Sequence, residues 1–169
     1  LKAPTQKQAT AKIAKAAEAR GESLTPEQLE AAARDSIGAI NMIRSYRMRG
    51  HLPANLDPLS LEPPKEDYAE LDPSIYGFEE KDYGREVFID GLMGIDRAPI
   101  GTVIDLVRRT YCGTIGVEYM HISDPQAKRW LQQRIESAEQ EEAFTENGKK
   151  AILQKLVEAE GFEQFLDVR

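Results

Sequence analysis

The strongest constraint on the fold is a long helix predicted over residues 25–49. It opens at Thr25-Pro26-Glu27-Gln28, which combines a hydroxyl N-cap, a proline at the first helical position and a glutamine three residues after the cap. Apolar residues then follow at steps of three and four and form one stripe along the helix; they are Leu29, Ala33, Ile37, Ile40 and Ile43. Gly50 is expected to end the helix. A helix of this length needs further elements to cover its apolar stripe.

The N-terminal segment 4–20 is also predicted to be helical. It is rich in Ala, Lys, Gln and Glu, which are good helix formers, and Gly21 follows it. Ile13 is its only large apolar residue. We therefore expect an N-terminal extension over 1–24 that carries a solvated, weakly packed helix, or one that packs on a partner.

Three more helices are predicted after residue 99. Segment 100–112 has apolar residues at helical spacing and ends before Gly113, and Ser123-Asp124-Pro125 opens a second helix that reaches about Ser137. In that helix Trp130 is the expected core anchor. Thr145 caps the last helix, which Gly161 is expected to end. Three apolar residues beyond this glycine suggest that the chain continues into another packed unit; they are Phe162, Phe165 and Leu166.

Residues 57–99 are not expected to form a long helix, because repeated prolines disfavour helical conformation in the residues before them. The segment is too aromatic for a flexible linker, so we expect an ordered loop that wraps over another part of the fold. Short extended segments are predicted at 87–89 and 115–122. The predicted fold class is therefore mainly α: an irregular helical domain of about four to five helices, with a long Pro-rich ordered loop and at most one or two short strands.

Composition excludes several classes of function. The net charge of −7 and the pI near 5.0 argue against a nucleic-acid binder, which needs a basic surface. Cys112 is the only cysteine and the two histidines are far apart, so neither a disulfide nor a structural zinc site is expected. No window approaches the ~20 apolar residues of a membrane span, and a cytoplasmic location is expected. Position 1 is Leu rather than Met, and we expect a piece of a longer polypeptide.

Basic side chains gather at the end of the 25–49 helix. Arg44, Arg47 and Arg49 either cap the helix and face solvent, or bind carboxylates or a phosphate from elsewhere. For His51 a hydrogen-bonded structural role is favoured over that of a catalytic base. Glu118 and His121 would fall on opposite faces of a strand, which disfavours an acid/base pair.

Other sites of chemistry are not indicated. Four acidic residues in the Pro-rich segment lack the glycine and spacing of an EF-hand, so a divalent-cation site is not expected there; they are Glu66, Asp67, Glu70 and Asp72. The sequence also contains no glycine-rich phosphate loop, no Gly-x-Ser-x-Gly and no His-Glu-x-x-His.

Two stretches carry a specific resemblance to a known family. Residues 46–59 read Tyr-Arg-Met-Arg-Gly-His-Leu-Pro-Ala-Asn-Leu-Asp-Pro-Leu, and residues 110–122 read Thr-Tyr-Cys-Gly-Thr-Ile-Gly-Val-Glu-Tyr-Met-His-Ile, followed by Lys-Arg-Trp-Leu-Gln-Gln-Arg-Ile-Glu at 128–136. From about Asp35 onward, in order and spacing, the sequence resembles the E1 component of 2-oxoglutarate dehydrogenase.

This resemblance implies an oxidoreductase of the citric acid cycle. The family decarboxylates 2-oxoglutarate with thiamine diphosphate and magnesium, works as a homodimer within a multienzyme complex, and passes the succinyl group to the lipoyl arm of its E2 partner. The chain resembles only the N-terminal helical region, with a domain over 25–169 that stops before the catalytic domains. The family's Gly-Asp-Gly…Asn and His-Arg-Gly-Arg stretches do not occur in it. No catalytic, cofactor-binding or metal residue is therefore assigned, and the piece alone is expected to be inactive.

The resemblance implies a structural role for the residues of its two motifs. We expect an interdomain set that braces the catalytic core and whose members have hydrogen-bond or ion-pair partners; the set is Arg47, Arg49, His51, Asn55, Asp57, Glu118, Tyr119 and His121. The alternative is a regulatory or scaffolding module whose loop and arginines bind a partner subunit or an anionic effector. A standalone RNA-binding domain is disfavoured by the acidic charge.

Overall fold

The computed structural model describes residues 4–59, 61, 68–137 and 144–168. The chain divides into two compact units, Leu1–Ser137 and Ala138–Arg169. Across the described residues, no helix has the combination of length and hydropathy that crossing a membrane requires.

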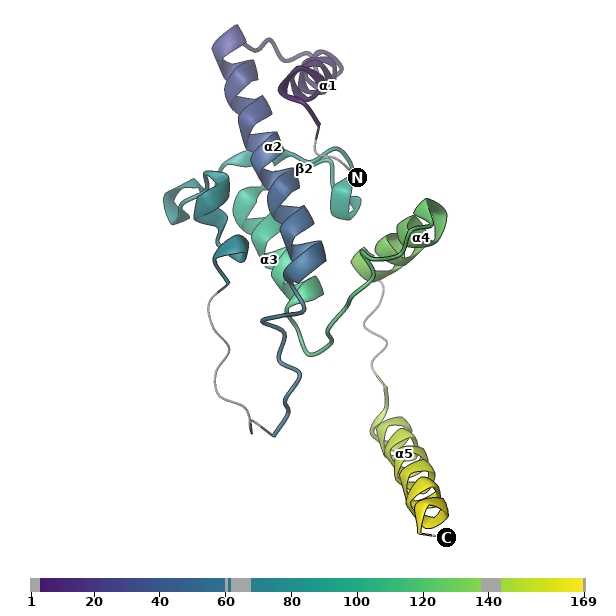
Figure 1. The fold of residues 1–169 in the computed structure, drawn as a ribbon. Helices are drawn as coiled ribbons and strands as arrows, with labels where there is room; N and C mark the ends of the chain where they lie inside the picture. The colour runs from purple at the N-terminus through teal and green to yellow at the C-terminus, as the bar shows by residue number, and fades with distance from the viewer. Residues whose placement is uncertain (1–3, 60, 62–67, 138–143, 169) are drawn as a thin grey trace. The chain divides into compact units, whose positions relative to one another are not determined.

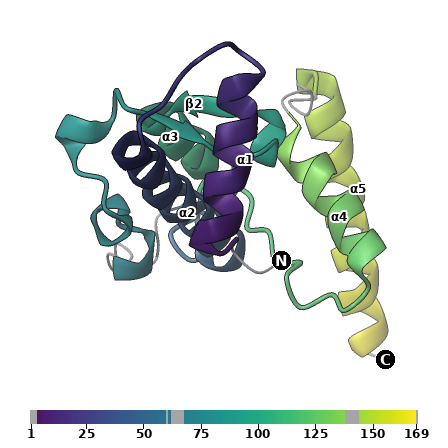
Figure 2. The same ribbon diagram turned by 90° about the horizontal axis from the view of Figure 1, so that it is seen from above.

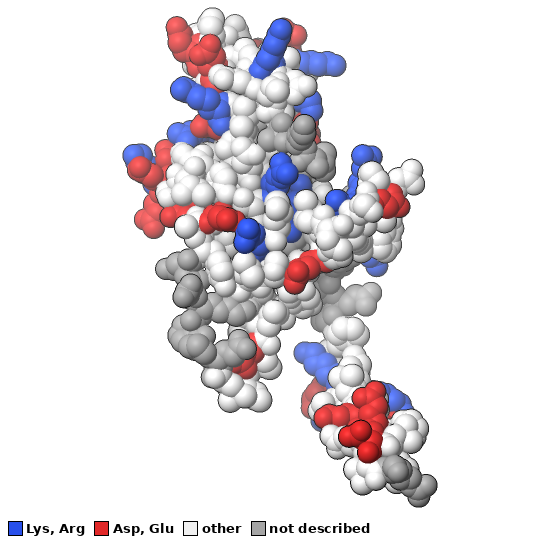
Figure 3. All heavy atoms as spheres, in the orientation of Figure 1, with Lys and Arg blue, Asp and Glu red and all other residues white. Residues whose placement is uncertain are grey.

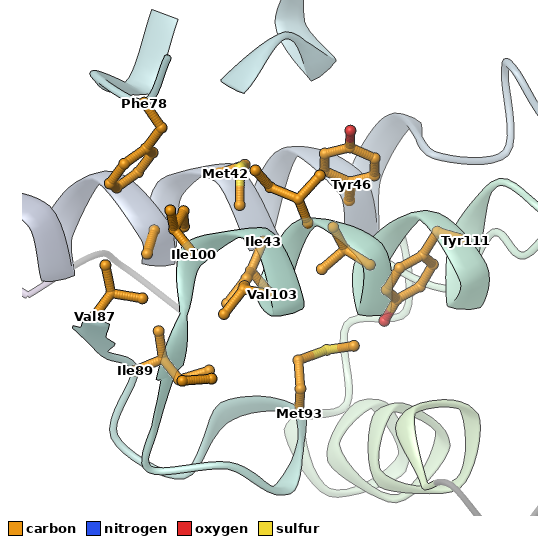
Figure 4. Packing of buried hydrophobic residues seen from close by; sticks show 14 of the residues in the cluster. Met42, Ile43, Tyr46, Phe78, Val87, Ile89, Met93, Ile100, Val103 and Tyr111 are labelled. Carbon is orange, nitrogen blue, oxygen red and sulfur yellow. The ribbon is translucent and has the colours of Figure 1, made fainter. Parts of the chain in front are cut away.

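Helices α2 and α3 form the centre of the first unit. Helix α2 (Pro26–Arg49) begins with the predicted capping box at Thr25 and Gln28, and α3 is Ile100–Tyr111. The two helices lie side by side (Figure 1). Their apolar side chains interleave with those of the hairpin that precedes α3, as Figure 4 shows. Both helices are thus confirmed, since caps and apolar spacing are local signals.

Helix α1 (Gln6–Glu18) packs across α2 (Figure 2). Ala9 and Ala17 are almost completely buried, and Ile13 is 0% exposed. Ile13 and Ala9 form a small cluster with Ala33 of α2. The expectation of a solvated helix is therefore wrong. Because three of these four side chains are methyl groups, the two helices approach closely enough to bury a face that contains one large residue.

A two-stranded antiparallel hairpin covers one side of the α2–α3 core. Strand β1 (Glu86–Phe88) pairs with β2 (Arg97–Pro99), with Val87 opposite Ala98. The 3-10 turn η4 (Leu92–Gly94) lies in the connection. Strand β1 was predicted at 87–89, whereas β2 lies in the segment expected to be loop. Its three residues end in proline and show no alternation long enough to indicate a strand.

The described part of the Pro-rich segment wraps over α2, as expected. It forms three short 3-10 turns, η1 (Ala69–Leu71), η2 (Pro73–Tyr76) and η3 (Glu80–Asp82), of which the first two contact α2. Phe78 is buried in the core beside them. Glu66 and Asp67 lie outside the described residues.

Helix α4 (Pro125–Glu136) begins as predicted, with the Asp124 carboxylate accepting a hydrogen bond from the N–H of Gln126. Trp130 is 63% exposed, so its predicted role as the core anchor is wrong. The helix packs instead through Leu131 and Ile135, which lie one and five residues further on and so face another direction. Segment 115–122 forms no strand, since β1 and β2 pair only with each other.

The second unit contains one long helix, α5 (Glu146–Asp167), which Thr145 caps as predicted. The helix continues through Gly161, so the predicted end at this glycine is wrong. Gly161 does not have the positive φ of a left-handed cap. A glycine inside a helix costs only about 1 kcal/mol, which good helix formers on both sides offset. The five helices and the single hairpin confirm the predicted fold class for the part of the chain that the structure describes.

Candidate functional site

A buried ion pair joins the C-terminal ends of α2 and α4. Nε of Arg47 donates to Oε1 of Glu136 at 2.6 Å, and Nη2 donates to Oε2 at 2.9 Å. The side chains are only 5% and 6% exposed. The planar guanidinium matches the carboxylate with two parallel hydrogen bonds, the strongest geometry for such a pair.

Two tyrosines extend this pair to the end of α3 and the following loop. The hydroxyl of Tyr111 donates to Oε1 of Glu136 at 2.6 Å and lies 3.0 Å from the hydroxyl of Tyr119. Because the single proton of Tyr111 is used on Glu136, Tyr119 donates to Tyr111. We call these four residues, Arg47, Tyr111, Tyr119 and Glu136, the tyrosine–arginine network. It ties three helices and a loop together with every hydroxyl used.

The electrostatics of the network favour a charged Arg47 and neutral tyrosines. Burial alone would lower the pKa of Arg47, but the hydrogen bonds and charge of Glu136 outweigh burial and raise it. Burial raises the pKa of Tyr111, and the negative charge of Glu136 raises it further. Burial likewise raises the pKa of Tyr119. None of these groups is poised to exchange protons near neutral pH.

Gly50, between Arg49 and His51, is required by the close approach of α2 to α3. A Cβ at this position would lie 2.5 Å from Cβ of Tyr111. The backbone of Gly50 has φ −61°, which any residue adopts, so the need for glycine is steric rather than conformational. The glycine of the Arg-Gly-His motif therefore allows Tyr111 to pack close enough to α2 to join the network.

A second group of contacts fixes the Pro-rich segment on the other side of the core. The hydroxyl of Tyr46 donates to the carbonyl of Leu71 at 2.9 Å and accepts from Nε of Arg108 at 3.3 Å. Burial raises the pKa of Tyr46 despite the nearby arginine. Figure 4 shows the hydroxyls of Tyr46 and Tyr111 pointing to opposite sides of the α2–α3 layer. Neighbouring turns of the two helices thus anchor separate parts of the chain.

The interdomain set divides between the interior and the surface. Arg47 and Tyr119 belong to the tyrosine–arginine network, whereas Arg49 forms an exposed ion pair with Glu70, 2.9 Å from Nε to Oε2. Nε2 of His51 lies 3.6 Å from Oε1 of Glu118, and Nδ1 of His51 is buried without a hydrogen-bond partner in the described structure.

The remaining members of the set make smaller contacts. The backbone N–H of Asn55 donates to the carbonyl of Gly113 at 2.8 Å, and Oδ1 of Asp57 accepts from the N–H of Leu59 at 3.2 Å. His121 is exposed, and within the described ranges its side chain has no hydrogen bond or ion pair. The structure therefore brings His51 to Glu118 but leaves His121 apart from both.

Sequence reasoning missed Glu136 and the hydroxyl of Tyr111. Tyr111 was interpreted as one more apolar position on the α3 stripe. Glu136 was noted only as the last residue of the 128–136 segment that resembles the E1 family. A signal for Glu136 was its place as an acidic residue in the last turn of a helix, where cations are favoured. In the described residues no group of three or more His, Cys, Asp or Glu side chains is placed to hold a metal ion. The tyrosine–arginine network holds the ends of three helices together.

Comparison with known proteins shows homology to one kind of enzyme subunit. No family model matches the chain. Over 151 residues, or 89% of this chain, it is 59% identical to the 2-oxoglutarate dehydrogenase E1 component of Brucella anthropi, and 58% identical to those of Brucella canis and Brucella suis. The chain is homologous to the 2-oxoglutarate dehydrogenase E1 component. It spans 15% of the length of these relatives.

The E1 homology extends into both units of the structure. The first unit has 137 residues, so a match of 151 residues takes in at least 14 residues of the second. The segment that contains α5 is therefore shared at least in part with the E1 relatives.

Proposed function

We propose that the chain is the N-terminal helical region of a 2-oxoglutarate dehydrogenase E1 protein and that its role there is structural and interdomain. The complete protein would decarboxylate 2-oxoglutarate and succinylate the lipoyl group of an E2 partner. It would act in the cytoplasm as a homodimer, within the multienzyme complex. In this proposal the 169 residues brace the catalytic part and have no activity of their own.

The residues of this chain do not fit thiamine diphosphate or magnesium. The Gly-Asp-Gly…Asn stretch with which the family holds both does not occur in the sequence. The acidic and histidine side chains that are described do not converge on any point in groups of three or more. We therefore derive no reaction step from this chain and assign the cofactor to other parts of the complete enzyme.

The observation that carries the proposal is the apolar surface of α5. All of its large apolar side chains are between 47% and 63% exposed; they are Ile152, Leu153, Leu156, Val157, Phe162, Phe165 and Leu166. Scattered exposed apolar residues are normal, but seven on one 22-residue helix are not.

These side chains form two faces rather than one stripe. With roughly 100° of rotation per residue, the four that precede residue 158 centre on one side of α5, and the three that follow residue 161 centre on nearly the opposite side. A helix that is apolar on opposite sides is typical of one buried between two neighbours. The remainder of the E1 chain supplies a suitable neighbour, because 85% of each relative's length lies outside the match.

The first unit provides a rigid support for contacts with the rest of E1. The tyrosine–arginine network locks the ends of three helices, and a fully paired buried network specifies one arrangement of them. The exposed pair Arg49–Glu70 and the partly exposed pair His51–Glu118 lie at the same end of α2 as Arg47. In this proposal Arg49, His51 and Glu118 contact another domain of the E1 protein.

The direct test places a charge on α5 in the complete E1 protein. Leu156→Glu is expected to lower decarboxylation or the yield of folded protein, because it buries a carboxylate in an apolar contact. Lys150→Glu is the matched control, since it places the same side chain roughly 120° away around the helix, between the two apolar faces. Equal activity and equal yield in both variants would refute a buried α5.

Two further measurements separate the proposal from a regulatory or scaffolding module. Arg49→Ala or His51→Ala in the complete enzyme should lower decarboxylation if these residues brace the core, whereas a loss confined to assembly with E2 would favour docking of a partner. Calorimetry of the 169-residue chain with thiamine diphosphate should show no heat of binding that depends on added magnesium. A clear micromolar isotherm that requires magnesium would overturn the proposed location of the active site.

A further inference from the structure

The first unit contains a basic cavity that the structural role does not explain. It has a volume of about 600 Å³ and lies between the start of α1, the middle of α2, the turn after β1 and α4. Its lining includes four cationic side chains, Lys12, Arg44, Arg47 and Lys128, and one acidic side chain, Asp90. Figure 3 shows basic atoms gathered on the face of the first unit between α2 and α4.

Two of these four cations are already neutralised by the protein. Lys12 forms an ion pair with Asp90, and Arg47 forms the two-bond pair with Glu136. The second pair uses Nε and Nη2 of Arg47, so Nη1 takes no part in the two hydrogen bonds to Glu136.

The other two cations have no partner of their own. Within the described residues, Arg44 and the ammonium of Lys128 take part in no ion pair or side-chain hydrogen bond. The cavity thus has a surplus of two positive charges, in a chain whose net charge is −7. Nearby charges of one sign in a concave site concentrate ligands of the opposite sign.

Exposed Arg44 and partly exposed Lys128 line the same cavity from two different helices. Arg44 lies three residues before Arg47, so both side chains project from the same face of α2. Lys128 and Gln132 are four residues apart on the facing side of α4 and place an ammonium and an amide beside each other. Three elements far apart in sequence therefore direct hydrogen-bond donors into one space.

The start of α1 adds to the positive potential. Pro4 and Thr5 line the cavity, and the first turn of this 13-residue helix contains no acidic side chain that would offset its dipole. The helix start is a supporting contribution, and the unpaired Arg44 and Lys128 are the primary evidence.

We propose that this cavity binds a small organic dianion through carboxylate or phosphate groups. Arg44 provides a guanidinium fork for one oxyanion group, and Lys128 provides the opposing point charge. Gln132 donates through its amide. The volume lies within the range of small-molecule sites, about 300–1,000 Å³, and exceeds that needed for a single inorganic ion. The proposal rests on this cavity alone and does not depend on the interdomain role.

The test is a titration of the full chain, labelled with ¹⁵N, with sodium pyrophosphate in one series and sodium malonate in another. Binding of either probe should shift backbone amide signals near Thr5, Arg44 and Lys128. The two series distinguish phosphate from carboxylate ligands. Added NaCl should weaken the binding, since an open charged site is screened.

Substitutions make the test specific. In Arg44→Gln/Lys128→Gln the dissociation constant should rise at least about tenfold, because charge-assisted hydrogen bonds to the ligand are lost. The control Lys15→Gln/Arg109→Gln removes one exposed lysine and one exposed arginine elsewhere on the same unit, and should leave the dissociation constant unchanged. Circular dichroism confirms that both variants are folded.

Three results would overturn the proposal. These are the absence of saturable shifts with both probes, shifts that map away from the cavity, and equal weakening in the control variant. The last result would mean that only the total charge of the chain matters.

Discussion

Breaking the pair between Arg47 and Glu136 should destabilise the first unit more than any change to a surface ion pair. In Arg47→Met the carboxylate of Glu136 remains buried and keeps only the hydrogen bond from Tyr111. Glu136→Leu leaves the guanidinium buried without a counter-charge. Removing one partner of such a pair typically costs about 3–5 kcal/mol, because an uncompensated charge stays in the interior.

A double-mutant cycle measures the coupling between positions 47 and 136 directly. Arg47→Met combined with Glu136→Leu removes both charges and fills the space with apolar atoms, so the double variant should be more stable than either single variant. We expect a coupling free energy of at least about 2 kcal/mol between the two positions. Arg49→Met is the matched control. Its ion pair with Glu70 has side chains that are 50% and 59% exposed, and such surface pairs contribute about 0–1 kcal/mol.

Urea denaturation measures these free energies with two probes. Far-UV circular dichroism reports all helices, and Trp130, the only tryptophan, reports on α4. The reasoning is refuted if the single variants lose less than about 1 kcal/mol, the value for an exposed pair, or if their effects add without coupling. A loss in Arg49→Met as large as that in Arg47→Met would also contradict it.

Three other predictions concern single features of the first unit. Gly50→Ala should lower the free energy of unfolding by about 1–3 kcal/mol, because its Cβ would lie 2.5 Å from that of Tyr111. In the control Gly84→Ala the new Cβ meets open space, and the loss should be about 0.5 kcal/mol or less. Equal losses would contradict the close approach of α2 to α3. The pKa values of Tyr111 and Tyr119 are raised in the folded chain. Their contribution to stability is therefore present below the unfolded tyrosine pKa of about 10 and is lost as pH rises above it. Tyr111→Phe should flatten this decline of unfolding free energy with pH, and an unchanged slope would be contrary evidence. Fluorescence of Trp130 in the 169-residue chain should be quenched efficiently by acrylamide, and a shielded signal would contradict its exposure.

Local signals in the sequence were sufficient to predict most helices. The starts of α2, α4 and α5 each have a hydroxyl or carboxylate N-cap, and the α3 stripe follows the helical period closely. These features act within a few residues of one another, so no knowledge of tertiary contacts is needed. The errors at Gly161 and at β2 occurred where a single glycine or proline was given more weight than its neighbours.

Features that depend on distant contacts could not be predicted from the sequence. The partner of Arg47 lies 89 residues away, and the place of Glu136 in the last turn of α4 does not indicate which cation it binds. Burial of Ile13 depends on alanines that let two helices approach, and exposure of Trp130 depends on which side of α4 meets the core. The cavity at Arg44 and Lys128 likewise requires α1, α2 and α4 to be placed together.

Hydrogen exchange of α5 tests the central claim most directly. Backbone amides of residues 146–167 are compared between the 169-residue chain and the complete E1 protein by mass spectrometry. If the two apolar faces of α5 are buried by the rest of E1, exchange should be slowed by about a hundredfold or more in the complete protein, since opening then requires breaking those contacts. Equal exchange in both proteins would show that α5 stays exposed and would contradict the interdomain role.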